Sequence, residues 1–179
     1  LAEEFGFTAE KVIEKIKAKG ESLCLLEGME RLEYLLEQSK NSRPMAQEHK
    51  TEQNKIRGCV SNLWLTGHKD TNNKMAYYHD AESHMTKGTA KVILDMVHGE
   101  DAREVGELDL DSFKPLGIKE LLTMQRQVGF ASLIERIVKL AQTQTYEEKL
   151  KEQQKDPKHN QWGIHGEPYK SFNVDEGKE

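Results

Sequence analysis

Apolar residues in the first forty positions recur with the spacing of an α-helix. Thr8 is a suitable N-cap for a first helix, which is expected to end at Gly20. The inward face of this helix carries Val12, Ile13 and Ile16. A second helix is expected over residues 22–38. Its apolar stripe comprises Leu25, Leu26, Met29, Leu32, Leu35 and Leu36.

The pattern becomes that of a β-hairpin after a polar loop over residues 39–55. Strand-favouring residues predict two strands, at 60–66 and 74–79. The connecting residues 67–73 are rich in the turn formers Gly, Asp and Asn. The two strands are therefore expected to pair in an antiparallel arrangement.

Helical spacing returns after the hairpin. A third helix is expected to begin at Asp80 or Ser83 and to end at His98, before Gly99. Its inward face carries Met85, Thr89, Val92, Ile93, Met96 and Val97. These elements together predict an α+β fold, with helices packed on a small antiparallel sheet.

The second half of the chain contains one strong helix and ends in a polar segment. A short helix over 102–107 and an irregular crossing over 108–118 are expected first, and the strong helix is expected to begin near Val128. Residues 1–141 are predicted to form one domain. Residues 142–179 are predicted to be a polar extension, partly helical at first and then flexible.

The composition fits a globular protein in a reducing environment. Hydrophobic residues make up 36% of the 179, enough for one core, and two cysteines in different contexts do not suggest a disulfide framework. The net charge of −5, with basic and acidic residues interleaved, argues against nucleic-acid binding. No apolar run approaches the roughly 20 residues that cross a bilayer, so no membrane function is expected. The chain begins with Leu1, which suggests a processed or trimmed product, cytoplasmic or, if a transit segment was removed, in an organelle matrix.

Cys59 stands where the polar loop turns into the first strand. Gly58 before it permits a sharp bend and leaves room around the sulfur, so we expect a thiol that another protein can reach. Cys24 lies in an apolar run and is expected on the inner face of a helix, as structural filler. Basic side chains upstream would lower the pKa of the Cys59 thiol if they lay close, although a solvated basic loop is the favoured interpretation. These side chains are His49, Lys50, Lys55 and Arg57.

The motifs around and after Cys59 resemble those of a known family. In order they are Gly58-Cys59-x-Ser61-x-x-Trp64, Asp80-x-Glu82, Lys87-Gly88, Leu116-Gly117-Ile118 and Leu122-Thr123-x-x-Arg126-x-x-Gly129. The series is similar to that of SufE proteins and their relative CsdE, over residues 12–141. Several motifs in one order are a more specific signal than a glycine–cysteine pair alone. The resemblance implies a SufE/IscU-like fold.

The resemblance also implies a function in sulfur transfer. SufE-like proteins accept sulfur from a cysteine desulfurase, so Cys59 would carry it as a persulfide, stimulate the desulfurase, and pass sulfur to a downstream cluster scaffold or another acceptor. Iron–sulfur cluster assembly is the favoured destination, and a tRNA-modifying enzyme is the alternative. Pyridoxal phosphate would belong to the desulfurase, and neither cofactor nor metal is expected on this chain. It would be an accessory protein with a covalent intermediate rather than a stand-alone enzyme, and a homodimer is compatible with the sequence.

The family answer to a labile persulfide is to keep the loop cysteine in an apolar hollow. Trp64 and the face of the hairpin are expected to provide its walls. Gly58 and Ser61 would support the loop. Arg126 matches an arginine associated with partner docking or loop placement, and an ordinary surface ion pair is the equal alternative.

Acidic and basic residues after the second strand complete the candidate site. Asp80 and Glu82 match acidic positions near the family's active loop, although helix capping is the favoured interpretation. Lys87 is expected to orient nearby acids, and Gly88 to let its helix approach the sheet closely.

Some positions depart from the family pattern. Val60 follows the cysteine where glutamine is frequent, and Leu121 stands where histidine is frequent. Met-Gln-Arg-Gln at 124–127 replaces the usual Pro-Ser-Arg-Ser. These differences affect the expected docking partner rather than the thiol chemistry.

Other functions fit the residues less well. A cluster scaffold needs about three converging thiolates, and zinc sites need ligand spacings that are absent here. His79 and His84 face one another across a strand–helix junction in one interpretation, but solvated or capping histidines are favoured. A cysteine hydrolase would need a histidine and an acid placed around Cys59. An interaction module with an idle Cys59 stays open.

Overall fold

A computed structural model describes residues 9–155 and confirms the α+β fold. Its α-helices and strands are α1 (Glu10–Cys24), α2 (Gly28–Lys40), β1 (Leu63–Lys69), β2 (Met75–Ala81), α3 (His84–Val97), α4 (Ala102–Gly106) and α5 (Met124–Lys155). The 3-10 helices are η1 (Gln47–His49), η2 (Asp111–Leu116) and η3 (Lys119–Leu121). The chain divides into two compact units, Leu1–Gln142 and Thr143–Glu179. The segment predicted to be flexible, and the expected cap Thr8, lie outside the described residues.

The hairpin is antiparallel, as predicted, with Leu63 opposite Ala81 and Lys69 opposite Met75. Asp70 closes the turn, because its carboxylate accepts hydrogen bonds from the Lys74 and Asn72 amides at 2.9 and 2.8 Å. The first strand begins at Leu63 rather than residue 60, since the preceding residues form a separate loop.

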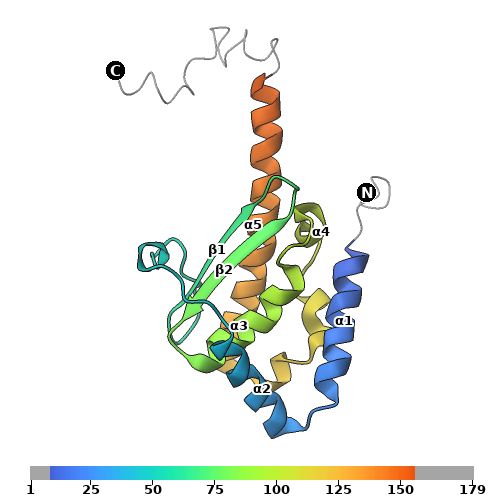
Figure 1. The fold of residues 1–179 in the computed structure, drawn as a ribbon, viewed down its shortest axis with the longest axis vertical. Coiled ribbons are helices and arrows are strands. Elements are labelled where there is room, and N and C mark those ends of the chain that lie inside the picture. The colour runs from blue at the N-terminus through green and yellow to red at the C-terminus, as the bar shows by residue number, and fades with distance from the viewer. Residues whose placement is uncertain (1–8, 156–179) are drawn as a thin grey trace. The chain divides into compact units, whose positions relative to one another are not determined.

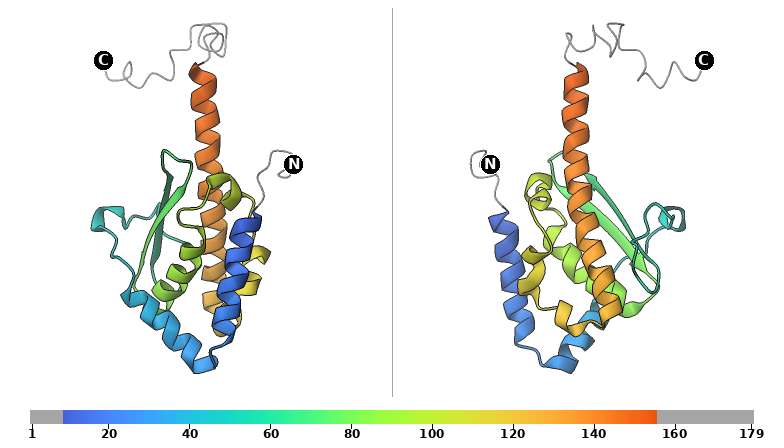
Figure 2. Two further views of the ribbon diagram at one scale, coloured as in Figure 1. Left: turned by 45° about the vertical axis from the view of Figure 1, so that its right-hand side comes forward. Right: turned by 180° about the vertical axis from the view of Figure 1, so that it is seen from behind.

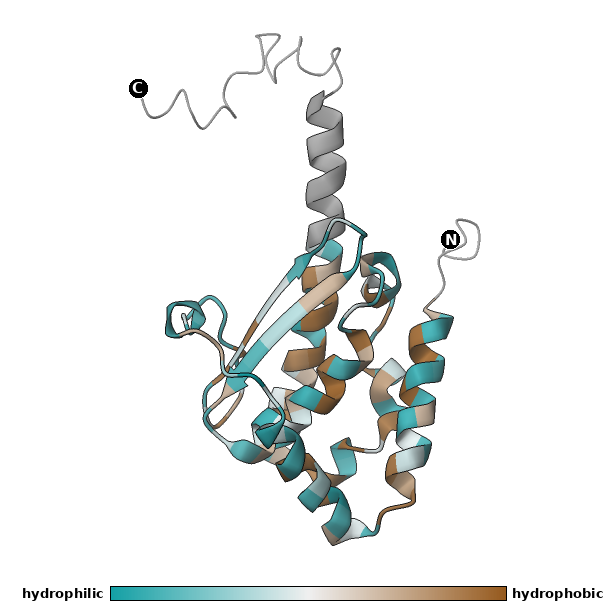
Figure 3. Ribbon diagram, in the orientation of Figure 1, coloured by the Kyte–Doolittle hydropathy of each residue, from teal (hydrophilic) through white to brown (hydrophobic). Residues whose placement is uncertain are grey.

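Helices α3 and α5 cover one face of the hairpin, and the loop over residues 41–55 lies on its other face (Figures 1 and 2). Helix α1 lies on the far side of α3 and α5 from the hairpin (Figure 2). Hydrophobic residues gather on α3 and α5 where they lie behind the hairpin (Figure 3). The Tyr77 hydroxyl of β2 donates to the Ile137 carbonyl of α5 at 2.7 Å, which ties the sheet to this helix. Residues buried most completely include Ile16, Leu65, Ile93, Phe113 and Ile137.

The boundary between the first two helices differs from the prediction. Gly20 does not end α1, which continues to Cys24. A Cβ at Gly20 would overlap the Pro115 carbonyl, so glycine is required there for close packing against η2. Helix α2 begins later than expected, at Gly28, where Glu27 and Glu30 form a reciprocal capping box.

Three residues that were predicted to face inward are exposed near the junction of α1 and α2. Leu25 and Met29 are 86% and 70% exposed, although the periodicity predicts both in an apolar stripe. Cys24 is exposed as well, so its prediction as structural filler is wrong. The apolar run at 23–26 crosses the end of α1, where the helical periodicity used for the prediction no longer applies.

Helix α5 begins one turn before the predicted Val128. Thr123 starts it, with its carbonyl accepting from the Gln127 amide at 2.9 Å and its hydroxyl from the Arg126 amide at 3.4 Å. In the part of the chain that the structure describes, no helix combines the length and apolar character needed to cross a membrane.

Candidate functional site: the Cys59 loop and its pocket

Cys59 lies in a short loop that is closed at its base like a hairpin. The Ile56 amide donates to the Leu63 carbonyl at 2.8 Å, and the Leu65 amide donates to the Asn54 carbonyl at the same distance. These bonds leave residues 57–62 to form the loop itself. The strand-like base therefore presents the cysteine near the tip of a loop with fixed ends.

Gly58 is required for this loop in two ways. Its φ of 84° lies in the left-handed region, which side chains rarely adopt. A Cβ at Gly58 would also lie 2.9 Å from a methyl group of Val128 on α5. The expected role of Gly58 as a loop-supporting residue thus has a specific geometric basis.

Glu82 holds the other end of the loop. Its carboxylate accepts from the Asn62 amide at 3.2 Å and from the Asn62 side chain at 3.0 Å, and its own amide donates to the Asn62 carbonyl at 3.0 Å. The favoured interpretation of Glu82 as a helix cap is therefore wrong. Ser83 caps α3 instead, by accepting from the Thr86 amide.

The Cys59 sulfur packs against the backbone of α5 at Gly129. A Cβ on Gly129 would lie 2.6 Å from the Cys59 Sγ, so glycine is needed for this approach. Burial raises the pKa of the half-buried Cys59 thiol above its ordinary value. The upstream basic residues do not reverse this effect. Lys50 pairs with Asp80 at 3.1 Å and Lys55 with Glu52 at 3.6 Å.

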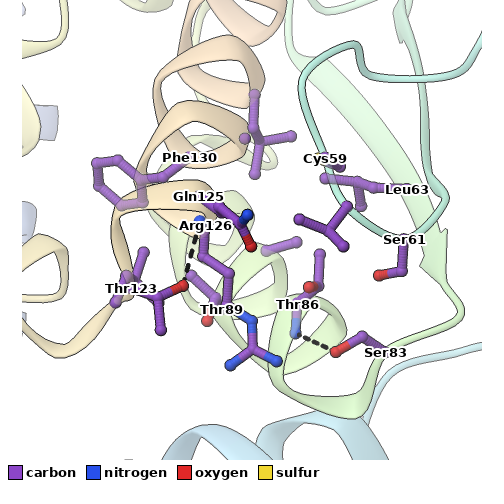
Figure 4. A pocket seen from close by; sticks show the side chains of 15 residues that line it. Cys59, Ser61, Leu63, Ser83, Thr86, Thr89, Thr123, Gln125, Arg126 and Phe130 are labelled. Atoms are coloured by element: carbon purple, nitrogen blue, oxygen red, sulfur yellow. Dashed lines mark hydrogen bonds between the residues drawn. The ribbon is translucent and has the colours of Figure 1, made fainter.

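A cavity of about 370 Å³ opens beside Cys59, between β1, α3 and the start of α5 (Figure 4). Ser61, an expected loop residue, lies at its edge. The apolar walls of the cavity are formed chiefly by Leu63, Ala90, Leu122, Phe130 and Leu133. The structure thus contains an apolar cavity beside the cysteine, as predicted, and most of its walls come from α3 and α5.

Arg126 contributes the charged side chain of the pocket lining. Its guanidinium extends away from Cys59, into another part of the pocket (Figure 4). Within residues 9–143, Arg126 forms no ion pair, so the surface-ion-pair alternative does not describe it.

Comparison with known proteins shows which family this chain belongs to. A family model described as "SufE: Fe-S metabolism associated domain" matches residues 18–141. The chain belongs to the SufE family. It is 32% identical to an uncharacterized SufE-like protein of Rhizobium etli over 112 residues, covering 60% of this chain and 76% of the relative. It is also 32% identical to the sulfur acceptor protein CsdE of Escherichia coli over 92 residues, covering 51% of this chain and 63% of CsdE.

A solved structure shows the same fold at low sequence identity. The solution structure of a hypothetical protein from Thermus thermophilus aligns with a TM-score of 0.63 and 19% identity, covering 74% of this chain and 96% of that protein.

Trp64 of this SufE-family chain is not a wall of the pocket. Side chains alternate along β1, so Leu63 faces the helices while Trp64 faces the opposite side of the hairpin. There the Lys50 ammonium lies 5.4 Å from the centre of the Trp64 ring, a cation–π contact. The prediction that Trp64 shields the cysteine is therefore wrong.

Asp80 and Lys87 form a separate cluster on that side. The Asp80 carboxylate lies 3.1 Å from both the Lys87 and the Lys50 ammonium groups and accepts from the Met45 amide at 3.0 Å. Burial alone would raise the pKa of Asp80, but the hydrogen bonds to Met45, Lys87 and Lys50 outweigh it and lower the pKa to about 2. Asp80 lies within β2, one residue before its end, and does not cap α3; the Lys87 ammonium pairs with it, as expected.

Gly88 and His79 also differ from their expected settings. Gly88 brings α3 against α2, where a Cβ would overlap the Leu35 carbonyl, and not against the sheet. His79 is buried, with Nε2 2.9 Å from the Ser42 hydroxyl, and burial lowers its pKa to about 4. A solvated His79 is thus excluded. In the described part of the chain, no three His, Cys, Asp or Glu side chains come together as a metal site.

Proposed function

We propose that this SufE-family protein accepts sulfur as a persulfide on Cys59, from a pyridoxal-phosphate-dependent cysteine desulfurase. The supporting observation is the position of Cys59, at the tip of an anchored loop, with its sulfur between Gly129 and an apolar pocket. The name of the Escherichia coli relative, sulfur acceptor protein CsdE, agrees with this role. The family description, Fe-S metabolism, supports a downstream acceptor in iron–sulfur cluster assembly.

The transfer is a thiol–persulfide exchange. The Cys59 thiolate attacks the outer sulfur of the desulfurase persulfide, a new S–S bond forms, and the desulfurase cysteine leaves as a thiolate. Since burial raises the pKa of Cys59, the thiol inside the pocket is a poor nucleophile. The proposal therefore includes movement of the loop tip out of the pocket when the desulfurase binds. Return of the persulfide to the pocket shields it from solvent.

Intact and peptide mass spectrometry after incubation with a cysteine desulfurase and free cysteine tests this proposal. We expect one additional sulfur on the Cys59 peptide, removable by a reducing agent, and faster desulfurase turnover because its persulfide is removed. The Cys59→Ser variant should show neither effect. Cys24→Ser is the matched control, because Cys24 is the more exposed thiol, and it should behave as the unsubstituted protein. Sulfur found mainly on Cys24 would contradict the proposal.

A further inference from the structure

The pocket beside Cys59 is larger than a persulfide requires. A persulfide adds one sulfur atom, whereas the cavity measures about 370 Å³. Sites for small molecules in proteins span about 300–1,000 Å³ and combine apolar walls with a few converging polar groups. The pocket therefore has the size and composition of a small-molecule site with a reactive sulfur at its edge.

The polar groups of the pocket favour an anion. Arg126 is its charged lining residue, and among the described residues no acidic side chain lines it. The guanidinium extends away from Cys59, into a different part of the pocket (Figure 4). The lining also includes the hydroxyl side chains of Thr86 and Thr89. Arginine binds carboxylates through two parallel hydrogen bonds, and hydroxyl groups of the same pocket can add further donors. A ligand that fills the pocket would thus place a carboxylate at Arg126 and its other end at the sulfur.

We propose, resting on the function above, that this pocket binds a small thiol bearing a carboxylate, of the cysteine class, which takes the outer sulfur from the Cys59 persulfide. The thiolate of the bound molecule attacks the outer sulfur, and a new S–S bond forms as the bond to Cys59 Sγ breaks. Cys59 leaves as a thiolate, and the small molecule departs as a persulfide. The exchange needs no oxidant or reductant, because the sulfane sulfur changes only its carrier.

Binding distinguishes this reaction from attack by a thiol in bulk solution. Burial disfavours the Cys59 thiolate, which makes Cys59 a slow leaving group. A thiol held by its carboxylate gains a high effective concentration at the sulfur and is oriented for attack. The rate should therefore depend on whether the thiol has a carboxylate as well as on its nucleophilicity.

The test uses the full chain loaded with inorganic polysulfide, in a Cys24→Ser background. Mass spectrometry first confirms the added sulfur on Cys59. The loss of that sulfur is then followed at rising concentrations of 3-mercaptopropionate or of 2-mercaptoethanol, with rates expressed per thiolate. We expect the rate to saturate with 3-mercaptopropionate and to rise linearly with 2-mercaptoethanol. Acetate-sized carboxylates without a thiol should inhibit only the first reaction.

Variants of Arg126 identify the binding group. Arg126→Gln should lower the second-order rate constant for 3-mercaptopropionate by about 10- to 100-fold, since charge-assisted hydrogen bonds contribute about 1.5–3 kcal/mol. Arg126→Lys should restore part of it, and neither variant should alter the rate with 2-mercaptoethanol. Lys119→Gln, which removes an exposed charge outside the pocket, is the matched control.

Linear kinetics with both thiols, or an Arg126→Gln protein that retains saturation, would overturn the inference. The inference would also be overturned if Arg126→Gln slowed the loading of Cys59 by a desulfurase but not the removal of sulfur by 3-mercaptopropionate. The guanidinium would then contact the desulfurase rather than a small thiol. Chemical loading keeps the two proposals separate. A desulfurase that fails to load Cys59 counts against the proposed function alone, and a loaded Cys59 without saturation counts against this inference alone.

Discussion

Gly129 has no side chain at the point where α5 passes the Cys59 sulfur. In Gly129→Ala, the added methyl group would lie 2.6 Å from Sγ, so the cysteine side chain must move away from α5 and lose its packing there. We expect the pKa of Cys59 to fall toward its ordinary value, because burial is what raises it. The pH dependence of iodoacetamide alkylation measures this shift, in a Cys24→Ser background.

The control for this substitution is Gly28→Ala, where a Cβ meets nothing within 4 Å. This variant should leave the alkylation profile unchanged. An unaltered Cys59 pKa in Gly129→Ala would show that the contact with α5 does not set the reactivity of the thiol.

Individual site residues were predictable to different degrees. Cys59, Gly58 and Arg126 were found because the family motifs name residue types at fixed separations. The structure places Cys59 and Arg126 in the lining of one pocket, and Gly58 next to Val128 of α5. Trp64 belongs to the same motif but faces the other way, because side-chain direction depends on where β1 begins. The function of Glu82 was missed, since its partner Asn62 is 20 positions away and no local pattern joins them.

Among the elements, the loop over residues 41–55 is held to the hairpin by the Asp80 cluster. Asp80→Asn would leave two ammonium groups without a charged partner in a site where the Asp80 side chain is 7% exposed. We expect the free energy of unfolding to fall by about 2–4 kcal/mol, as measured by urea denaturation at neutral pH.

Asp95→Asn is the comparison for this cluster. Asp95 also pairs with a lysine, Lys91, at 2.7 Å, but its side chain is 46% exposed. Because solvent screens exposed pairs, its loss should cost less than about 1 kcal/mol. Equal effects of the two variants would mean that burial does not strengthen the Asp80 cluster.

Element types were predicted better than element ends. Periodicity identified the helices and the hairpin, because apolar side chains must repeat wherever one face is buried. Gly20 has the sequence setting of a helix end, yet it lies inside α1 and permits contact with Pro115. The sequence around a glycine does not show whether it ends a helix or permits close packing. At Gly20 the packing partner, Pro115, lies about a hundred residues away in the sequence.

The folded molecule as a whole should lose stability in two steps as the pH falls. His79 has its pKa lowered to about 4 by burial, so its stabilising contribution is complete above pH about 6.5 and is lost as the pH falls toward 4. Lys87, Asp80 and Lys91 also act on this ring. The contribution of Asp80 is present above its unfolded pKa of about 3.9 and is lost as the pH falls toward 2.

Urea denaturation between pH 7 and pH 4 measures the first step. The lowered pKa of His79 corresponds to a loss on the order of 3 kcal/mol. His79→Gln should flatten this part of the profile, whatever its effect on stability at pH 7. If the free energy of unfolding of the variant fell with pH as steeply as that of the original protein, the first step would belong to another group.

The pocket itself was beyond prediction from local patterns. Its walls come from β1, from α3 and from the start of α5, segments separated by up to about seventy residues. Sequence reasoning expected an apolar hollow only through the family resemblance. The identity of its walls depends on how far each helix is rotated about its own axis, which periodicity leaves undetermined.

The contact between Gly88 and the Leu35 carbonyl fixes that rotation for α3. One side of the helix touches α2 backbone to backbone, and the adjoining side presents Thr86, Thr89 and Ala90 to the pocket. A helix moves as a rigid rod, so even one methyl group at residue 88 would displace all three lining residues together. The shape of the cavity beside Cys59 therefore depends on the contact between Gly88 and α2, on a different surface of the same helix. Substitutions at that contact would change how a ligand fits the cavity, although every residue that lines it stays the same.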